Sequence, residues 1–214
     1  FPIVVYSQGT TLHWGAEAIM LTAGSNVEWL VNDMGLIPDA QSSDAMAASV
    51  ASSDGVMYVP ALIGMGTPHW DYGARGTLLG LTRGTAKAHV VRAVLEGVAH
   101  RGADLLEASE IDTGLRVERL RVDGGMSRNA VFAQALANAT GRPIDISRDT
   151  EATTLGAAFL AGVTAGVWDN LAQTAALVQP LRTVEPTAAP LRAQWHEAVR
   201  RARGWIPELS ALDF

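Results

Sequence analysis

The stretch that most constrains the fold is Leu120–Asn129, where a short apolar run ends at Asp123 and meets two adjacent glycines before a helical pattern begins. This order predicts a strand, a bare loop and the first turn of a helix. Gly124 and Gly125 leave the backbone without Cβ atoms and free to adopt positive φ, so a flat ligand can lie directly on the main chain. A helix N-terminus also offers unpaired N–H groups to a negative group. The segment therefore indicates a nucleotide-binding site.

The same pattern has a simpler explanation, which is a strand-to-helix turn that uses glycine only to reverse the chain. Spacing alone does not separate the two. Two familiar phosphate-binding patterns do not occur in the sequence: the dinucleotide pattern Gly-x-Gly-x-x-Gly and the loop that ends in Gly-Lys-Ser/Thr. A nucleotide would have to be held in another way.

Composition narrows the class of protein. The 214 residues suffice for one well-cored domain, 1–214, and are too few for two domains of average size. Hydrophobic residues make up 48% and charged residues 18% of the chain, which supports a globular fold. Sixteen basic and 22 acidic residues give a net charge of −6 without a basic tract, which disfavours nucleic acid as a partner.

The residue types also bear on location. Cysteine is absent, which excludes disulfides and thiolate metal sites and favours a reducing compartment, the cytoplasm. No apolar run approaches the roughly 18 residues of a membrane span, and no export signal is expected. The chain opens on the strand-like run Phe1–Tyr6 without a methionine, which suggests a piece of something longer.

Apolar periodicity and turn residues predict the elements of the first half of the chain. Strands are expected where apolar runs end at glycine or proline, and helices where apolar residues recur at helical spacing. The predicted elements are a strand Trp14–Thr22, a helix from Ser25 or Asn26 to Met34, a helix Asp44–Ser52, a strand Met57–Val59 and a long surface loop Ala61–Ala74.

Strands and helices alternate in the second half. The longest helix is expected from Ala86 to about Ala108, capped by Thr85, with Arg92 and Glu96 paired one turn apart. The other predicted elements are strand Thr77–Leu81, strand Arg119–Val122, helix Ser127–Thr140, strand Pro143–Ser147, helix Thr153–Val167, a looser stretch with Pro180, Pro186 and Pro190, and a final helix of about Leu191–Arg203. This order favours an α/β fold with a mixed sheet and helices on both of its faces.

Other kinds of site are disfavoured by spacing. The five histidines are not paired four residues apart, so structural roles are favoured over metal ligation. They are His13, His69, His89, His100 and His196. No Gly-x-Ser-x-Gly elbow occurs, so an acyl-transfer enzyme is not expected.

Several motifs, in a fixed order, resemble those of the FGGY carbohydrate kinases. Gly76–Leu81, followed after seven residues by His89–Glu96, is similar to the second signature of that family. Further segments look like the glycerol kinases within it: Tyr58–Ala61, Gly66–Asp71, Ala74–Gly76, Gly80–Arg83, Arg121–Gly125 and Thr154–Ala158. The similarity extends from about Trp14 to Trp205.

The resemblance implies both a fold and a site. Glycerol kinases have two actin-like (ribonuclease H-like) domains with a catalytic cleft between them, and this chain looks like the C-terminal domain alone. In the family that domain supplies most of the pocket for the adenosine part of ATP. Carried over position by position, the resemblance places Gly125 under the adenine with Gly124 beside it, Asn129 near the base, and Gly24 near the ribose and phosphates.

Glu28 departs from the family pattern. It stands where typical glycerol kinases carry glutamine, and the exchange removes an amide donor and adds negative charge near a polyphosphate. We expect this change to weaken or reshape nucleotide binding. It also leaves open a different class of function, a non-catalytic domain that kept the fold and serves as a nucleotide-binding or assembly surface.

The resemblance further implies that the chemistry needs a second domain. In the family, the proton-accepting aspartate, the polyol contacts, the first phosphate loop and the Mg²⁺ ligands lie outside the part matched here, so no catalytic residue and no metal ligand is assigned to this chain. Phosphoryl transfer depends on positioning and charge stabilisation across a closed cleft, so the chain alone is expected to be inactive. The parent enzyme is expected to convert glycerol and MgATP to glycerol 3-phosphate and ADP, with xylulose, erythritol or another polyol as alternative substrates. Homo-oligomers are common in the family.

Overall fold

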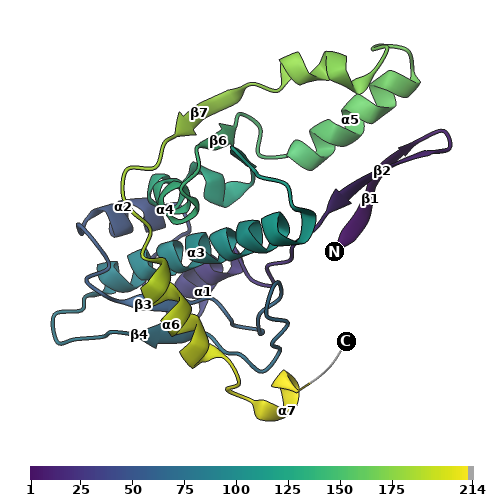
Figure 1. Ribbon diagram of the computed structural model, residues 1–214. Coiled ribbons are helices and arrows are strands. Elements are labelled where there is room, and N and C mark those ends of the chain that lie inside the picture. Colours follow the sequence, from purple (N-terminus) through teal and green to yellow (C-terminus); the bar gives the residue numbers. More distant parts are fainter. Residues whose placement is uncertain (212–214) are drawn as a thin grey trace.

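Helix α3 (Lys87–Thr113) is the longest helix, and most of the other elements pack around it (Figure 1). The structure is a computed structural model, and it describes residues 1–211. The helix begins one residue later than expected and extends five residues beyond Ala108. Its predicted cap was wrong: the hydroxyl of Thr85 accepts a bond from Thr82 N–H, while His89 Nδ1 accepts the N–H of Ala86 at 3.0 Å.

The described strands form three small sheets. Strands β1 (Pro2–Gln8) and β2 (Thr11–Ala16) make an antiparallel hairpin, and β3 (Met57–Val59) pairs antiparallel with β4 (Thr77–Leu79). In the third sheet, β5 (Leu120–Val122) runs parallel to β6 (Ile144–Ser147), which pairs antiparallel with β7 (Pro180–Val184). The third sheet is therefore mixed, as the sequence predicted.

The helices fall close to their predicted positions. The described helices other than α3 are α1 (Ser25–Asn32), α2 (Ser42–Ala48), α4 (Ala130–Thr140), α5 (Ala152–Thr164), α6 (Arg192–Ala202) and α7 (Pro207–Ser210), with two 3-10 helices, η1 (Gly125–Arg128) and η2 (Leu171–Leu177). The predicted pair of Arg92 and Glu96 is present at 2.8 Å.

The hydrophobic core joins the mixed sheet to α3 and α4. Ile144 and Ile146 of β6, two residues apart, both point into it and are almost fully buried. They lie in one cluster with Leu95 of α3 and Phe132 of α4. This packing fixes the ends of β5 and α4, which flank the two glycines.

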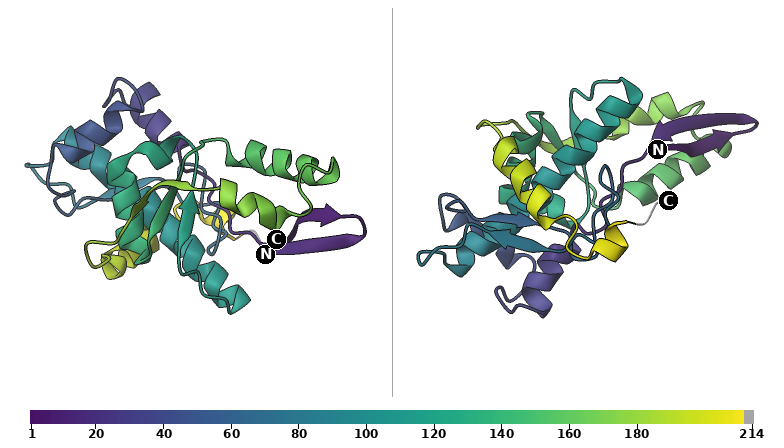
Figure 2. Two further views of the ribbon diagram at one scale, coloured as in Figure 1. Left: turned by 90° about the horizontal axis from the view of Figure 1, so that it is seen from above. Right: turned by 60° about the horizontal axis from the view of Figure 1, so that its bottom comes forward.

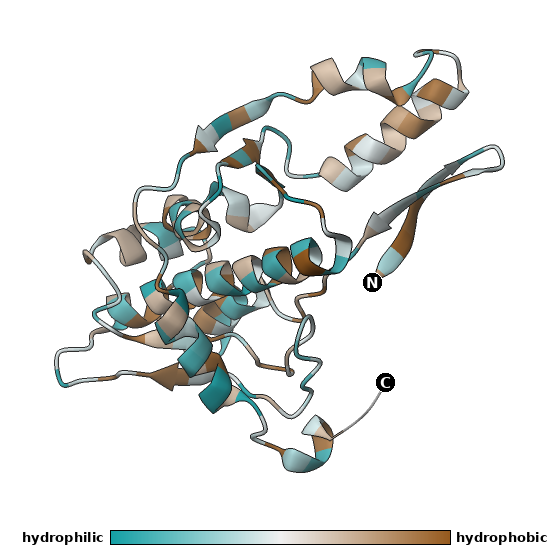
Figure 3. Ribbon diagram, viewed as in Figure 1, coloured by the Kyte–Doolittle hydropathy of each residue, from teal (hydrophilic) through white to brown (hydrophobic). Residues whose placement is uncertain are grey.

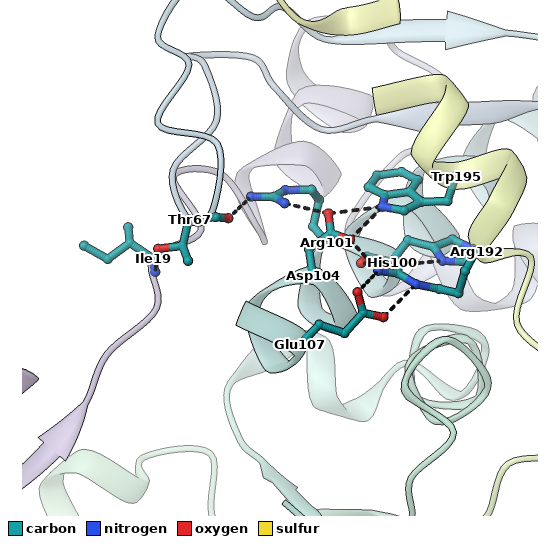
Figure 4. A network of polar contacts seen from close by, with 8 residues as sticks. All are labelled: Ile19, Thr67, His100, Arg101, Asp104, Glu107, Arg192 and Trp195. Carbon is teal, nitrogen blue, oxygen red and sulfur yellow. Dashed lines mark hydrogen bonds and ion pairs between the residues drawn. The ribbon is translucent and has the colours of Figure 1, made fainter. Parts of the chain in front are cut away.

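A buried polar network ties α3 to α6 and to the loop after β3 (Figure 4). The carboxylate of Asp104 accepts from Arg101 Nη1 at 2.6 Å, from Arg192 Nη2 at 2.5 Å and from Trp195 Nε1 at 2.9 Å. Arg101 also donates to the carbonyl of Thr67 at 2.6 Å. His100 stacks on Trp195, and burial, helped by Arg192, lowers the pKa of His100 to about 4. The histidine is therefore neutral at physiological pH.

The stretch Ala61–Ala74 is a loop, but the expectation that it lies on the surface was wrong. Ala61, Met65 and Ala74 are almost fully buried. A buried loop needs partners for its polar backbone groups, and the carboxylate of Asp71 supplies some of them. It accepts the N–H groups of Gly73 and Ala74, both at 2.9 Å.

Two strand predictions also need correction. The strand predicted at Trp14–Thr22 is Thr11–Ala16, because that segment pairs with Pro2–Gln8 across a tight turn. The stretch after Pro180, expected to be loose, contains β7. Proline is tolerated there because Pro180 is the first residue of a strand at the edge of its sheet.

The hairpin and α5 project from the same side of the body in all three views (Figures 1 and 2). Both carry exposed apolar residues (Figure 3): Val5 and Trp14 of the hairpin are more than half exposed, and α5 has no charged residue yet buries none of its side chains. A helix that is apolar all round is normally buried. Among the described residues, no helix is long and apolar enough to span a membrane.

Replacing Asp104 by asparagine tests the polar network. The change leaves Arg101, which is 1% exposed, without a charged partner, so we expect the free energy of unfolding to fall by about 3–5 kcal/mol in urea titrations. Glu107 also pairs with Arg192, but its side chain is half exposed, so Glu107→Gln should cost less than about 1 kcal/mol. Equal losses in the two variants would contradict the account.

Candidate functional site

The two glycines form an open step in the backbone at the end of β5. Gly124 adopts φ of 82° and ψ of 175°, a conformation that side chains rarely tolerate. The buried hydroxyl of Ser127 donates to the carbonyl of Gly124 at 2.7 Å and closes the turn. Gly125 is exposed, and a Cβ atom added to it would meet nothing within 4 Å. The step is therefore neither filled by side chains nor covered by another segment among the described residues.

A second glycine lies beside this step although it is far away in the sequence. Gly24 is the N-cap of α1, and a Cβ atom added to it would come to 3.9 Å from the sulfur of Met126. Met126 directly follows Gly125 and packs against the core. Gly24 and Gly125, both predicted site residues, are thus brought together. We call the surface formed by Gly24, Gly124 and Gly125 the glycine shelf.

Buried polar residues fix the segment that carries Gly24. Asn26 is fully buried, and its Nδ2 donates to the carbonyls of Thr22 and Ala23 at 3.1 and 2.9 Å. Its Oδ1 accepts from the hydroxyl of Tyr58 at 2.8 Å, and burial raises the pKa of Tyr58. From the sequence, Asn26 was expected only as a possible first residue of the helix. An asparagine in the first turn of a helix was the signal for a bond back to the preceding carbonyls.

Asn129 acts as the N-cap of α4. Its Oδ1 accepts the N–H of Phe132 at 2.8 Å, and its Nδ2 donates to Ser43 Oγ at 3.0 Å. Asp44 Oδ1 accepts the N–H of Val131 at 3.0 Å. The expectation that this helix offers unpaired N–H groups was therefore wrong for Val131 and Phe132, because protein side chains already occupy them. What Asn129 keeps is one side-chain N–H.

Glu28 lies one turn into α1. It lies four positions after Gly24, so the two positions share a face of the helix. Its side chain is exposed and makes no hydrogen bond or ion pair with the described residues. It therefore adds an uncompensated negative charge on the side of α1 that carries Gly24.

A cavity of about 200 Å³ adjoins the shelf at the carboxyl ends of β5 and β6. Ligands of open α/β sheets commonly bind at this end of parallel strands. Its lining includes Asp123, which directly precedes Gly124. The carboxylate of Asp123 accepts the N–H of Ala152 at 3.2 Å and so connects the glycine step to the start of α5. Asp145 also lines the cavity. Burial alone would raise the pKa of its carboxyl, but hydrogen bonds from Thr183 and Arg119 outweigh burial, and the pKa lies below its usual value.

One group of described residues has the spacing of metal ligands, but it lies outside the shelf. Potential ligand atoms of Asp104, Glu107 and His196 lie within 4.8 Å of one another. The guanidinium of Arg192 pairs with both carboxylates, at 2.5 and 2.9 Å. These carboxylates are therefore structural partners of Arg192.

Comparisons with known proteins agree with the motifs. Residues 3–165 match the family described as the FGGY family of carbohydrate kinases, C-terminal domain. Glycerol kinase of Dechloromonas aromatica is 44% identical over 203 residues, which cover 92% of this chain and 40% of that protein. Glycerol kinase of Deinococcus radiodurans is 42% identical over the same shares. The chain thus spans about 40% of the length of these curated relatives.

Solved structures resemble the fold as a whole. The glycerol kinase of Plasmodium falciparum, solved with ADP, superposes with a TM-score of 0.84 at 30% identity and covers 94% of this chain and 41% of its own. A xylulose-type kinase from Brucella ovis gives a TM-score of 0.72 at 31% identity, over 92% of this chain and 40% of that one. The predicted α/β, actin-like (ribonuclease H-like) fold is confirmed.

Alanine substitutions at Gly124 and Gly125 test two features of the shelf: the positive φ of Gly124 and the open space above Gly125. Gly124→Ala should lower the free energy of unfolding by about 1–2 kcal/mol, because its φ of 82° disfavours a Cβ atom. Gly125→Ala should change it by less than about 0.5 kcal/mol, because a Cβ atom there meets no neighbour. Urea unfolding of both variants measures this. A larger loss for Gly125→Ala than for Gly124→Ala would show that the step has a different shape.

Proposed function

The chain belongs to the FGGY family of carbohydrate kinases, and on this basis we propose that it is the nucleotide-binding domain of a glycerol kinase-like enzyme. The parent enzyme would transfer the γ-phosphoryl group of MgATP to a terminal hydroxyl of glycerol, giving glycerol 3-phosphate and ADP. The single observation that carries the proposal is the open glycine step next to Gly24, a flat patch of bare main chain within a fold shared with these kinases.

Each of the predicted nucleotide-binding residues has a proposed role. The adenine would rest on Gly125 and Gly124, where a Cβ atom at position 125 would occupy its place. Asn129 would hydrogen-bond near the base through its remaining side-chain N–H. Gly24 would let the ribose and phosphates approach the backbone at the start of α1. Glu28 is the weakest of these assignments, because its negative charge opposes a polyphosphate.

Mg²⁺ would neutralise the charge of the phosphates when it is bound. Two of the described carboxylates near the shelf are Glu28, which has no hydrogen bond or ion pair with the described residues, and Asp123, which is bonded to Ala152. Mg²⁺ is usually held by one or two carboxylates together with substrate phosphates. The resemblance favours ligands in the rest of the protein, and we place them there.

We also assign the polyol-binding residues and the catalytic base to the rest of the protein. The rest of the protein would, in addition, cover the exposed apolar surface of this chain. The bare apolar faces of α5 and of the hairpin support this, because exposed patches of this kind are usually interfaces. On its own the chain should therefore self-associate, which light scattering over a range of concentrations would measure. Native homo-oligomers are a separate possibility, to be measured on the parent protein. We also propose a cytoplasmic location.

A kinase for xylulose, erythritol or another polyol is the second candidate. The similarity to the Brucella ovis kinase, at 31% identity, favours keeping it. The substrate contacts are assigned outside this chain, so the shelf serves either reaction equally well.

Titration of the 214-residue chain with ADP by calorimetry tests the proposal. We expect weak binding at up to millimolar ADP, and no binding by Gly125→Trp, whose ring would occupy the position of the adenine. Gly125 is exposed and a Cβ atom there meets nothing within 4 Å, so we expect the variant to fold, and its melting temperature is the control. Unchanged ADP binding by Gly125→Trp would refute the shelf.

Activity assays test whether this chain binds the nucleotide while the rest of the protein supplies the reacting groups. The chain alone should transfer no phosphoryl group to any polyol, because the reacting groups lie elsewhere and the cleft cannot close. The full-length protein should phosphorylate glycerol faster than other members of a panel of polyols and ketoses. Turnover by the chain alone would overturn the proposal, and a preference for xylulose would favour the second candidate.

A further inference from the structure

We propose that Ser43 and Asp44, neighbouring residues of α2, are positioning residues for the nucleotide base. They would hold Asn129 and the first turn of α4 so that Asn129 presents a single N–H donor at the shelf. This inference rests on the function proposed above. Both residues lie more than 80 positions before the groups that they bind, and neither belongs to the glycine motifs.

Ser43 determines which way the amide of Asn129 faces. The hydroxyl of Ser43 donates its only hydrogen to the carbonyl of Ala40 at 2.6 Å, and Ser43 is 2% exposed. It can therefore only accept a bond from Asn129, at 3.0 Å, and Nδ2 must face it. A flipped amide would place two oxygens against each other.

A second bond gives the same orientation independently. The N–H of Phe132 can only donate, so the atom of Asn129 that it meets at 2.8 Å must be Oδ1. With both ends of the amide fixed, one hydrogen of Nδ2 is left over. Asn129 is half-buried, and in the proposed role this hydrogen faces the ligand. It would pair with a nitrogen acceptor of the base.

Asp44 binds a second N–H group in the first turn of α4. Its Oδ1 accepts the N–H of Val131 at 3.0 Å. A carboxylate at a helix N-terminus is also favoured by the helix dipole. Together the two residues of α2 fix the cap and the first turn, and Asn129 lies four residues after Gly125. A shift of α2 would therefore move the donor relative to the shelf.

Four variants of the 214-residue chain separate positioning from general stability. Ser43→Ala and Asp44→Ala should each weaken ADP binding about tenfold by calorimetry, since each removes one bond that holds the cap. Asp44→Asn, which retains an oxygen acceptor, should stay within about threefold of wild type. Ser42→Ala is the matched control, because the hydroxyl of Ser42 donates to the exposed Asp39, which precedes α2 in the sequence, and not to Asn129.

The affinity for inorganic tripolyphosphate, which carries no base, distinguishes positioning of the base from a general structural role. This affinity should be the same in all four variants and in wild type. Losses of ADP and tripolyphosphate affinity in equal proportion, or ADP binding within twofold of wild type in both alanine variants, would overturn the inference. Failure of wild type itself to bind ADP would refute the proposed function, and the positioning role with it.

NMR of the wild-type chain tests the orientation of Asn129 without any substitution. In NMR spectra of the free chain, the side-chain amide proton of Asn129 that is bonded to Ser43 should exchange with solvent more slowly than the other one. Added ADP should shift mainly the other proton. Equally fast exchange of both protons in the free chain, or a shift of neither proton on saturation with ADP, would contradict the inference.

Discussion

The first turn of α4 must find partners for its N–H groups, and the way the chain supplies them shapes the candidate site. Asn129 accepts the N–H of Phe132 and Asp44 accepts the N–H of Val131, so protein side chains already bind two of the first N–H groups of the helix. The open surface is instead the bare main chain of Gly124 and Gly125 just before it. The site is therefore better suited to the flat face of a base than to a phosphate group at α4.

The core explains how distant segments reach this surface. The sheet, α3 and α4 share one hydrophobic cluster, and the sulfur of Met126 lies between that cluster and Gly24. The buried bonds of Asn26 and Tyr58 fix the start of α1 from the other side. Asp104 joins α6 to the same helix α3. The shelf is thus rigidly supported, whereas α5 buries none of its side chains and the hairpin leaves Val5 and Trp14 more than half exposed.

Local patterns in the sequence predicted the elements around the shelf. The strand, the glycine pair and the helix ending at Gly141 follow from short-range rules of periodicity and capping, and so does the pair of Arg92 and Glu96. The buried loop Ala61–Ala74 was not predictable in this way, because its composition is that of a surface loop. Its burial depends on Asp71, whose carboxylate satisfies backbone groups of that loop.

Contacts between polar side chains that are far apart in the sequence could not be predicted, because they leave no local pattern in it. Ser43 reaches Asn129 across 86 positions, and Arg192 reaches Asp104 across 88. Such pairs exist only once the core has brought their helices together. The motifs that resemble the FGGY family supplied the candidate residues Gly24, Glu28, Gly124, Gly125 and Asn129; the structure brings the two glycine segments together, and their contact with a nucleotide stays a prediction.

Backbone-amide NMR of the 214-residue chain during titration with ADP tests the central claim most directly. If the base rests on the bare main chain, the amide signals of Gly24, Gly124 and Gly125 should shift first and saturate together, while signals of the hairpin and of α6 stay in place. Saturating shifts confined to residues away from the shelf, with the three glycine signals unchanged, would contradict the account.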